Sequence, residues 1–260
     1  MKKLMSILMV ICLCAGLCAC KKSSKPKTPE ETYERALGSV NTASGVKVTF
    51  TSNVTLLEND GSMQAGFDGV LCVSRTEAGE IASVDGTLTL NQSGTELEIP
   101  VQYYYEGGRL YTAMNNSKYY AEMSFDTAIS RMGPGCAIFF TAAEGDFTEL
   151  NFTENEDGTG NISFILPAEK IDCVSGLEGL WNGLVDTAGE DASITFQDVR
   201  GYVTCDESYA PAEASLTLTA SLNRGGSNIA VTDEISLSVE LSEELTISAP
   251  DTGSYTELTD

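Results

Sequence analysis

The 260-residue chain contains no histidine. Histidine is the usual base of nucleophilic triads and dyads and a frequent zinc or iron ligand, so the sequence excludes Ser-His-Asp triads, Cys-His dyads and His-ligated metal sites. Basic residues are also scarce, because 15 Lys and Arg stand against 38 Asp and Glu, a net charge of −23. A surface that binds nucleic acid needs clustered Lys and Arg, so we expect no nucleic-acid partner.

Other catalytic motifs are missing as well. The chain has no P-loop, no G-x-G-x-x-G and no G-x-S-x-G motif. The carboxylates of Glu154, Glu156 and Asp157 cluster, but they precede Gly158, which favours a solvated turn over an acid–base site. We therefore expect a protein that is not an enzyme and that needs no cofactor and no metal.

The N-terminus has the pattern of an export signal. Lys2 and Lys3 precede an apolar stretch from Leu4 to Leu17, which is too short, at ~1.5 Å per residue, to span a ~30 Å hydrocarbon core as a helix. The following Leu17-Cys18-Ala19-Cys20 resembles a bacterial lipobox, in which the last cysteine is lipidated. We predict a signal peptide over residues 1–19 and lipidation at Cys20; the alternative is a plain signal peptide cut nearby.

A basic tether follows the predicted anchor. Residues 20–27 carry four lysines, which could be attracted to an anionic membrane surface or could serve as a soluble spacer. From Thr28 onward nine basic residues face 38 acidic ones, a net charge of −29. We predict an acidic domain on the extracytoplasmic face of a bacterial membrane, with the membrane as its partner through the lipid anchor.

Four cysteines remain in the body of the chain: Cys72, Cys136, Cys173 and Cys205. An exported domain can form two disulfides from them, in three connectivities between which the sequence does not choose, or can keep free thiols. None of the spacings is C-x-x-C, which excludes a zinc ribbon and a thioredoxin-type motif.

Residues 28–260 are predicted to form one domain that begins with a helix and continues with strands. Thr28-Pro29 is a helix start, and an apolar stripe with helical spacing follows it up to Asn41. Alternating apolar and polar residues then predict antiparallel strands at 46–56, 63–73, 81–90, 95–105, 109–114 and 118–123.

The second half mixes helices and strands. We expect short helical segments at 125–131 and 136–143, a hairpin of 147–152 with 161–166, and a helix over 171–185. Strands are expected at 193–204, 214–222, 229–239 and 244–249. Six of the ten tyrosines lie between residues 103 and 120, where cross-strand packing is favoured over ligand stacking.

This order of elements resembles the LolA/LolB and LppX/LprG type of lipoprotein. Tyr103-Tyr104-Tyr105-Glu106-Gly107-Gly108-Arg109-Leu110-Tyr111 is similar to a hairpin found in such proteins, and Leu245-Thr246-Ile247-Ser248-Ala249-Pro250 to their closing segment. The resemblance implies an α+β fold: a curved, incompletely closed antiparallel β-sheet, a half-barrel, with a few helices packed on its concave face. It also implies an apolar cavity for acyl chains and no catalysis.

From these features we expect a lipoprotein that binds a lipid or another apolar ligand. The residues predicted for the cavity wall are Phe139, Phe140, Leu177 and Trp181. The alternative is an envelope sensor or protein-binding regulator on the same fold, because a fold does not fix a function. A solute-binding protein of two α/β lobes is disfavoured, since the alternating βα pattern is missing.

Overall fold

The computed structural model describes residues 25–26, 28–58, 61–92, 94–173, 193–224 and 227–258. The described α-helices are α2 (Pro29–Thr42) and α3 (Phe125–Met132), with short 3-10 helices at η1 (Cys136–Phe139), η2 (Glu144–Asp146), η3 (Ala168–Cys173) and η4 (Thr252–Ser254). The described strands are β1 (Gly45–Glu58), β2 (Gly61–Thr76), β3 (Gly79–Gln92), β4 (Thr95–Glu106), β5 (Arg109–Met114), β6 (Ser117–Glu122), β7 (Glu149–Glu154), β8 (Gly160–Leu166), β9 (Ser193–Phe196), β10 (Val199–Cys205), β11 (Pro211–Arg224), β12 (Ser227–Ser242) and β13 (Thr256–Glu257).

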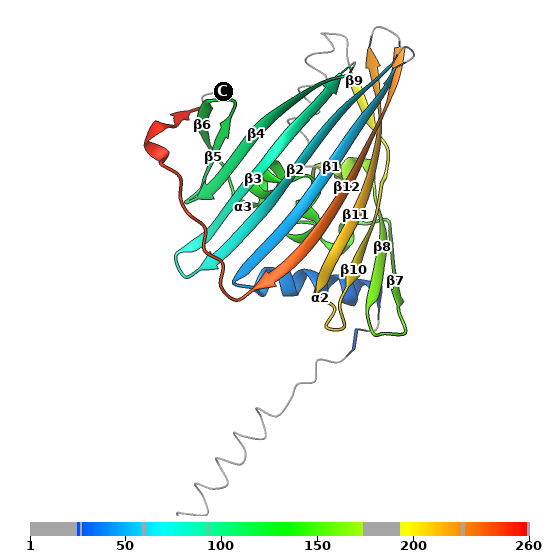
Figure 1. Ribbon diagram of the computed structural model, residues 1–260. Helices are drawn as coiled ribbons and strands as arrows, with labels where there is room; N and C mark the ends of the chain where they lie inside the picture. Colours follow the sequence, from blue (N-terminus) through cyan, green and yellow to red (C-terminus); the bar gives the residue numbers. More distant parts are fainter. Residues whose placement is uncertain are drawn as a thin grey trace, which may run out of the picture.

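All of these strands belong to one sheet, which curls but does not close (Figure 1). Its order is β13-β6-β5-β4-β3-β2-β1-β12-β11-β10-β8-β7, and β9 pairs with β11 beside this path. Every described pairing is antiparallel except that of β13 with β6. The predicted half-barrel with helices on its concave face is confirmed.

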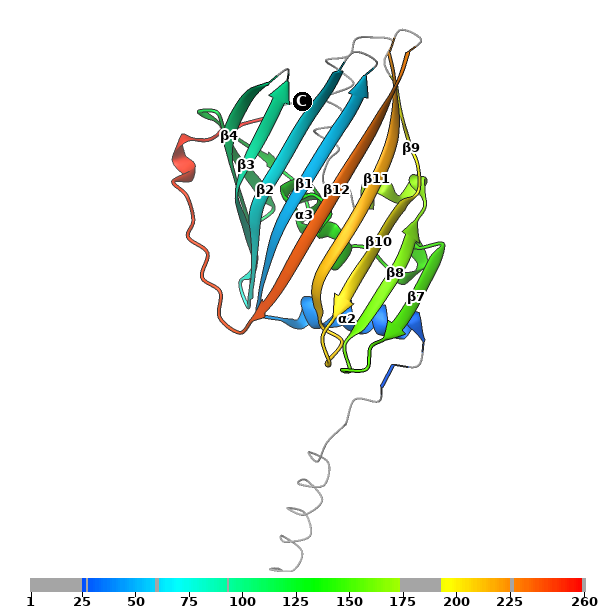
Figure 2. The same cartoon turned by 45° about the vertical axis from the view of Figure 1, so that its right-hand side comes forward.

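Helix α2 lies across one end of the sheet, which we call the lower end; the opposite end, near β9, is the upper end (Figures 1 and 2). The helix begins where the sequence predicts, because the Thr28 hydroxyl accepts a hydrogen bond of 3.2 Å from the Glu31 N–H. Its apolar stripe is buried through Tyr33, Ala36 and Val40. The Tyr33 hydroxyl donates to the carbonyl of Ile138 at 2.9 Å, which fixes α2 to the η1 segment.

The strands alternate between a buried inner face and an exposed outer face, as their period-two pattern predicts. Strand β12 shows this most regularly: Ile229, Val231, Ile235, Leu237 and Val239 are buried, and the residues between them are mostly exposed. The inner faces of β1, β2, β11 and β12 therefore form one wall whose side chains are mainly apolar.

Helix α3 and the η1 segment cover the lower half of this wall from the concave side (Figure 1). The chain between them approaches the sheet closely at two glycines. A Cβ on Gly133 would lie 3.2 Å from the Phe50 ring, and one on Gly135 would lie 2.7 Å from a methyl of Leu216. Gly135 also has φ +71°, a backbone conformation that favours glycine.

Two strand predictions need correction. The strand expected over 193–204 is interrupted at 197–198, because β9 pairs only with the upper part of β11, whereas β10 lies between β11 and β8. The strand expected over 244–249 is wrong, since that segment has no regular structure. Strand β12 already pairs with β1 and β11, so no edge is free beside it, and the chain pairs again only at β13.

Only the first residues of the helix predicted over 171–185 can be compared. Residues 168–173 form η3, and residues 174–192 lie outside the described part of the chain. Within the described ranges, no helix has the length and apolar character needed to cross a bilayer.

Candidate functional site

The inner wall stays apolar beyond the region covered by α2, α3 and η1. We call the buried inward-facing side chains between residue 233 and the upper end the upper wall; they are Val54, Leu56, Ala65, Leu218, Ala220, Leu222, Ile229 and Val231. Ile194 and Phe196 of β9 pack against the same cluster. At ~3.3 Å per residue, the wall extends about 13 Å along β12, from Asp233 to Ile229.

One carboxyl group interrupts the wall. Asp233 occupies an inward position of β12 and is 0% exposed. Its cross-strand partners are aliphatic, Leu218 on β11 and Val54 on β1. The hydroxyl of Ser52, itself buried, donates a hydrogen bond of 2.9 Å to Asp233 Oδ1. Among the buried side chains of the described ranges, Asp233 Oδ2 stands out because it has no hydrogen-bond partner.

Burial governs the protonation of this group. Removal from water raises the pKa of Asp233 to about 6, and the hydrogen bonds from the Ser52 hydroxyl and the Asn53 backbone oppose that rise only in part. At neutral pH Asp233 is therefore mainly ionised, in a low-dielectric setting that disfavours the charge. Sequence reasoning missed this residue, although an Asp in the apolar register between Val231 and Ile235 was a detectable signal.

The four predicted wall residues fall into two groups. Phe139 is 2% exposed in the core at η1, and Phe140 is partly buried with its ring 5.7 Å from the Arg75 guanidinium. Leu177 and Trp181 lie outside the described residues. The structure thus puts the two phenylalanines on the concave side, and their role in a cavity stays a prediction.

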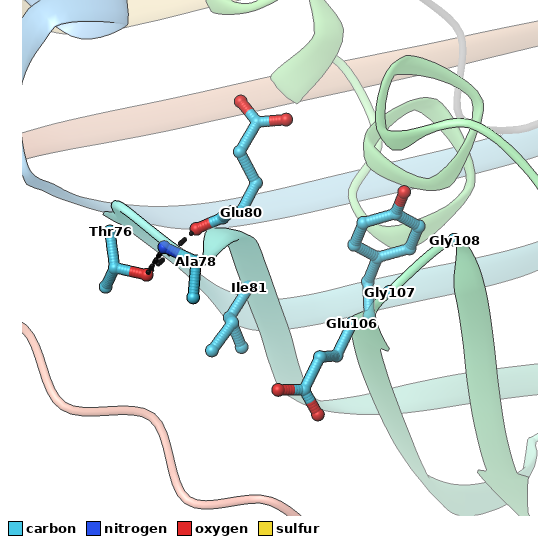
Figure 3. A pocket seen from close by; sticks show the side chains of 9 residues that line it. Thr76, Ala78, Glu80, Ile81, Glu106, Gly107 and Gly108 are labelled. Atoms are coloured by element: carbon cyan, nitrogen blue, oxygen red, sulfur yellow. Dashed lines mark hydrogen bonds between the residues drawn. The ribbon is translucent and has the colours of Figure 1, made fainter.

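A pocket of about 350 Å³ lies between the β2–β3 and β4–β5 turns at the lower end (Figure 3). It is lined by Thr76, Ala78, Gly79, Glu80, Ile81, Tyr105, Glu106, Gly107 and Gly108. Figure 3 shows the carboxylates of Glu80 and Glu106 pointing away from each other. Since its charged groups do not converge, this pocket offers no defined place for a ligand.

A second hollow, of about 610 Å³, lies over β1 to β4 where Gly69 and Gly86 are cross-strand partners. The rings of Phe50 and Phe67 occupy the space that side chains at these glycines would fill. Asp68 and Asp85 line the hollow, and the Gln102 amide donates to Asp85 at 2.8 Å. None of its lining side chains is cationic, so we assign it no ligand.

A third hollow, of about 380 Å³, lies where the tether meets the domain. Lys25 forms an ion pair with Glu154 of β7, and the Arg35 guanidinium lies 4.9 Å from the centre of the Tyr209 ring. The pair is exposed, so its contribution to stability is small. Through the Lys25–Glu154 ion pair, the end of the tether lies beside the β7–β8 hairpin at the lower end.

The tyrosines pack against each other, as predicted. Tyr111 lies at the centre of an outer-face group, with ring centres at 6.1 Å from Tyr104, 5.6 Å from Tyr120 and 5.4 Å from Tyr255. Tyr255 belongs to the C-terminal segment that holds β13 against β6. The rings thus secure the sheet edge, which explains their clustering without a ligand.

The cysteines show no disulfide within the described part of the chain. Cys72, Cys136 and Cys205 carry free thiols. Burial raises the pKa of Cys136, and burial also raises the pKa of Cys205 to about 12. Both thiols therefore stay protonated and unreactive at neutral pH. In the same described ranges, no group of three or more Cys, Asp or Glu is arranged to hold a metal ion.

Comparison with known proteins gives similarity in structure alone. No family model matches the chain, and no curated protein matches it. Among solved structures, the chain is similar to LprF from Mycobacterium bovis, with a TM-score of 0.41, 10% identity, and coverage of 85% of this chain and 96% of LprF.

A protein of the DUF1329 family from Desulfovibrio piger is also similar, with a TM-score of 0.28, 8% identity, and coverage of 85% of this chain and 96% of that protein. Similarity at this level concerns the fold alone.

Proposed function

We propose that this protein is a lipid-anchored, extracytoplasmic lipoprotein that holds an apolar ligand on the concave face of its half-barrel, without catalysing a reaction. The observation that carries the proposal is the upper wall, a buried apolar face that continues about 13 Å from Asp233 toward the upper end. Such a length suits an extended hydrocarbon chain. A binding site of this kind needs apolar walls and few polar groups.

The anchor is the second component of the proposal. Its support is the export signal and the Leu17-Cys18-Ala19-Cys20 sequence, followed by a short lysine-rich tether. Metabolic labelling with an alkyne fatty acid tests it directly. The wild-type chain is expected to take up the label and Cys20→Ser to lose it; an unlabelled wild-type chain would contradict the anchor.

Ligand binding is tested by native mass spectrometry after incubation of the protein with a bacterial total lipid extract. We expect bound species with the masses of lipids or fatty acids. Ala220→Phe fills the upper wall from the inner face of β11 and should reduce bound lipid about tenfold or more.

The matched control is Thr217→Phe, which adds the same ring on the exposed outer face of the same strand. It should bind as the wild type does. Circular dichroism establishes that both variants fold. A wild-type protein without bound lipid, or equal lipid binding by both variants, would count against the upper wall as the binding site. A co-purified protein in place of lipid would favour the alternative of a protein-binding regulator.

A further inference from the structure

The C-terminal segment, residues 251–258, covers one edge of the sheet with few buried contacts. Figure 1 shows it in red beside β6. Tyr255 is partly buried, and the other seven residues of the segment are exposed. Residues 243–250, which lead to it, form no helix or strand. Regions with few buried contacts and exposed hydrogen bonds open at a lower free energy than the core, so this cover can separate from β6 while the rest of the sheet stays folded.

The segment uses only part of the edge that it covers. Strand β6 has six residues, and β13 pairs with two of them, Tyr119 and Tyr120. The Leu258 N–H adds one hydrogen bond of 2.8 Å to the Tyr120 carbonyl. In the described part of the chain, no other strand pairs with this edge. A longer strand would therefore form more backbone hydrogen bonds with β6, as happens when a peptide adds to a sheet edge.

The outer face beside this edge accepts an aromatic ring. The centre of the Tyr255 ring lies 5.4 Å from that of Tyr111 and 5.4 Å from the Lys118 ammonium. Tyr111 in turn packs against Tyr120, with ring centres 5.6 Å apart. Tyrosines and a cation thus form a platform on which a ring gains both aromatic and cation–π contacts.

The same platform accepts an acidic residue. The Tyr120 hydroxyl donates a hydrogen bond of 3.2 Å to the Glu257 carboxylate, and the Lys118 ammonium donates one of 3.3 Å to the Ser254 hydroxyl. The Arg109 guanidinium lies 5.3 Å from the centre of the Tyr120 ring. Two of the nine basic residues that follow Thr28 therefore lie at this edge, which favours an acidic peptide on an otherwise acidic domain.

We infer that the β6 edge is a docking site for an extended segment of another protein, and that the C-terminal segment occupies the site until that partner displaces it. The partner has the chemistry of Tyr255-Thr256-Glu257, an aromatic ring followed two residues later by a carboxylate. Its ring takes the place beside Tyr111, its carboxylate accepts from Tyr120, and its backbone pairs along β6. The site lies on the outer face and the sheet edge, so the inference stands apart from lipid binding on the concave face.

A fluorescein-labelled peptide with the sequence of residues 250–260 serves as the probe, and its binding to the full-length protein is followed by fluorescence anisotropy. In the wild type, the segment competes with the peptide. Tyr255→Ala in the protein removes the ring that holds the segment, so the peptide should bind this variant about tenfold more tightly than the wild type. A peptide carrying Tyr255→Ala should bind the same variant about tenfold more weakly than the unchanged peptide.

The matched control is Tyr202→Ala, which removes another exposed tyrosine from the outer face, on β10 and away from β6. It should bind the peptide as the wild type does. A second variant, Tyr255→Ala with Tyr111→Ala, removes the platform as well and should lose the gain of Tyr255→Ala. Circular dichroism establishes that all three variants fold.

Four results would overturn the inference. They are no binding of the peptide to Tyr255→Ala, equal binding to this variant and to the wild type, equal binding of the peptides with and without the ring, and an equal gain in Tyr202→Ala. Analytical ultracentrifugation tests the choice of partner: the wild type should be monomeric. A dimer that Tyr255→Ala dissolves would show that the occupant is the C-terminal segment of a second copy and not another protein.

Discussion

Arg75, on strand β2, donates a hydrogen bond of 2.8 Å to the carbonyl of Val40 in the last turn of α2. The same nitrogen lies 3.2 Å from the carbonyl of Ala43, the residue that ends the helix. The last turn of α2 has no basic residue of its own, so the sheet supplies the cation that the end of a helix favours. One side chain thus joins the lower end of the sheet to the helix lying across it.

Replacing Arg75 should loosen this junction. Arg75→Ala leaves two carbonyls at the helix end without their donor and removes the guanidinium from the Phe140 ring, so we expect a loss of about 2 kcal/mol in the free energy of unfolding. Urea denaturation measures the loss. Arg131→Ala, which removes an exposed arginine from α3, is the control and should change stability by less than about 0.5 kcal/mol. Equal effects of the two would contradict the role of Arg75.

Asp233 should give the protein an unusual dependence on pH. Its pKa is about 6 in the folded state and near 4 in the unfolded chain, so the folded state binds the proton more tightly. The contribution of the Asp233 carboxyl to the free energy of unfolding is fully present below pH 4 and is lost as the pH rises through 6. The full effect is about 3 kcal/mol.

Asp233→Asn has no carboxyl group to ionise, so it does not lose stability as the pH rises. It should be more stable than the wild type at pH 8, by roughly 6 °C in Tm. The difference between the two proteins should shrink as the pH falls from 8 to 4. Thermal unfolding followed by circular dichroism at several pH values checks this. Glu234→Gln, on the outer face, should show no comparable gain, and a gain as large as that of Asp233→Asn would assign the effect to net charge.

The contact between Gly69 and Phe50 allows a comparison within one strand. A Cβ on Gly69 would lie 2.6 Å from the Phe50 ring, which is 1% exposed and has little room to move. Gly69→Ala should therefore cost about 1–3 kcal/mol. Gly66→Ala, three residues earlier on β2, meets no atom closer than 3.7 Å and should be close to neutral. Urea midpoints of the two variants decide, and a Gly69→Ala variant as stable as the wild type would show that the ring shifts freely.

The thiols should react in an order set by their burial. Cys72 is half-buried, whereas Cys136 and Cys205 are buried. Iodoacetamide at pH 8 should modify Cys72 first and the other two only after unfolding, as read by peptide mass spectrometry. A disulfide joining any two of these three cysteines in protein purified without reductant would contradict the free thiols of the structure.

Local patterns predicted most of the elements, because their signals lie within the segments themselves. The cap at Thr28, the apolar stripe of α2 and the period-two strands up to β6 all appear at the expected positions. What local pattern could not predict is the pairing of β1 with β12, which joins Gly45 to Ser242 and creates the concave face. The two strands lie far apart in the sequence, and their alternation is compatible with several partners.

The same limit applies to the candidate site. Acidic residues near turns drew attention at the sequence level, yet Asp157 only closes its own turn by accepting a hydrogen bond of 3.0 Å from the Thr159 N–H. The aliphatic surroundings of Asp233 follow only from the pairing of β12 with β1 and β11, which the sequence did not predict. The strand predicted at 244–249 failed for a related reason, since its composition suits a strand but the preceding strand, β12, is already paired on both sides.

The ion pair of Lys25 with Glu154 bears on how the domain would stand on a membrane. Lys25 is five residues from Cys20, and five residues span at most about 18 Å. A lipid at Cys20 would therefore hold the α2 end toward the bilayer and turn the opposite end outward. A cargo leaving by that end would face the aqueous side or an approaching acceptor, and exchange with the anchoring membrane would require the whole domain to tip over.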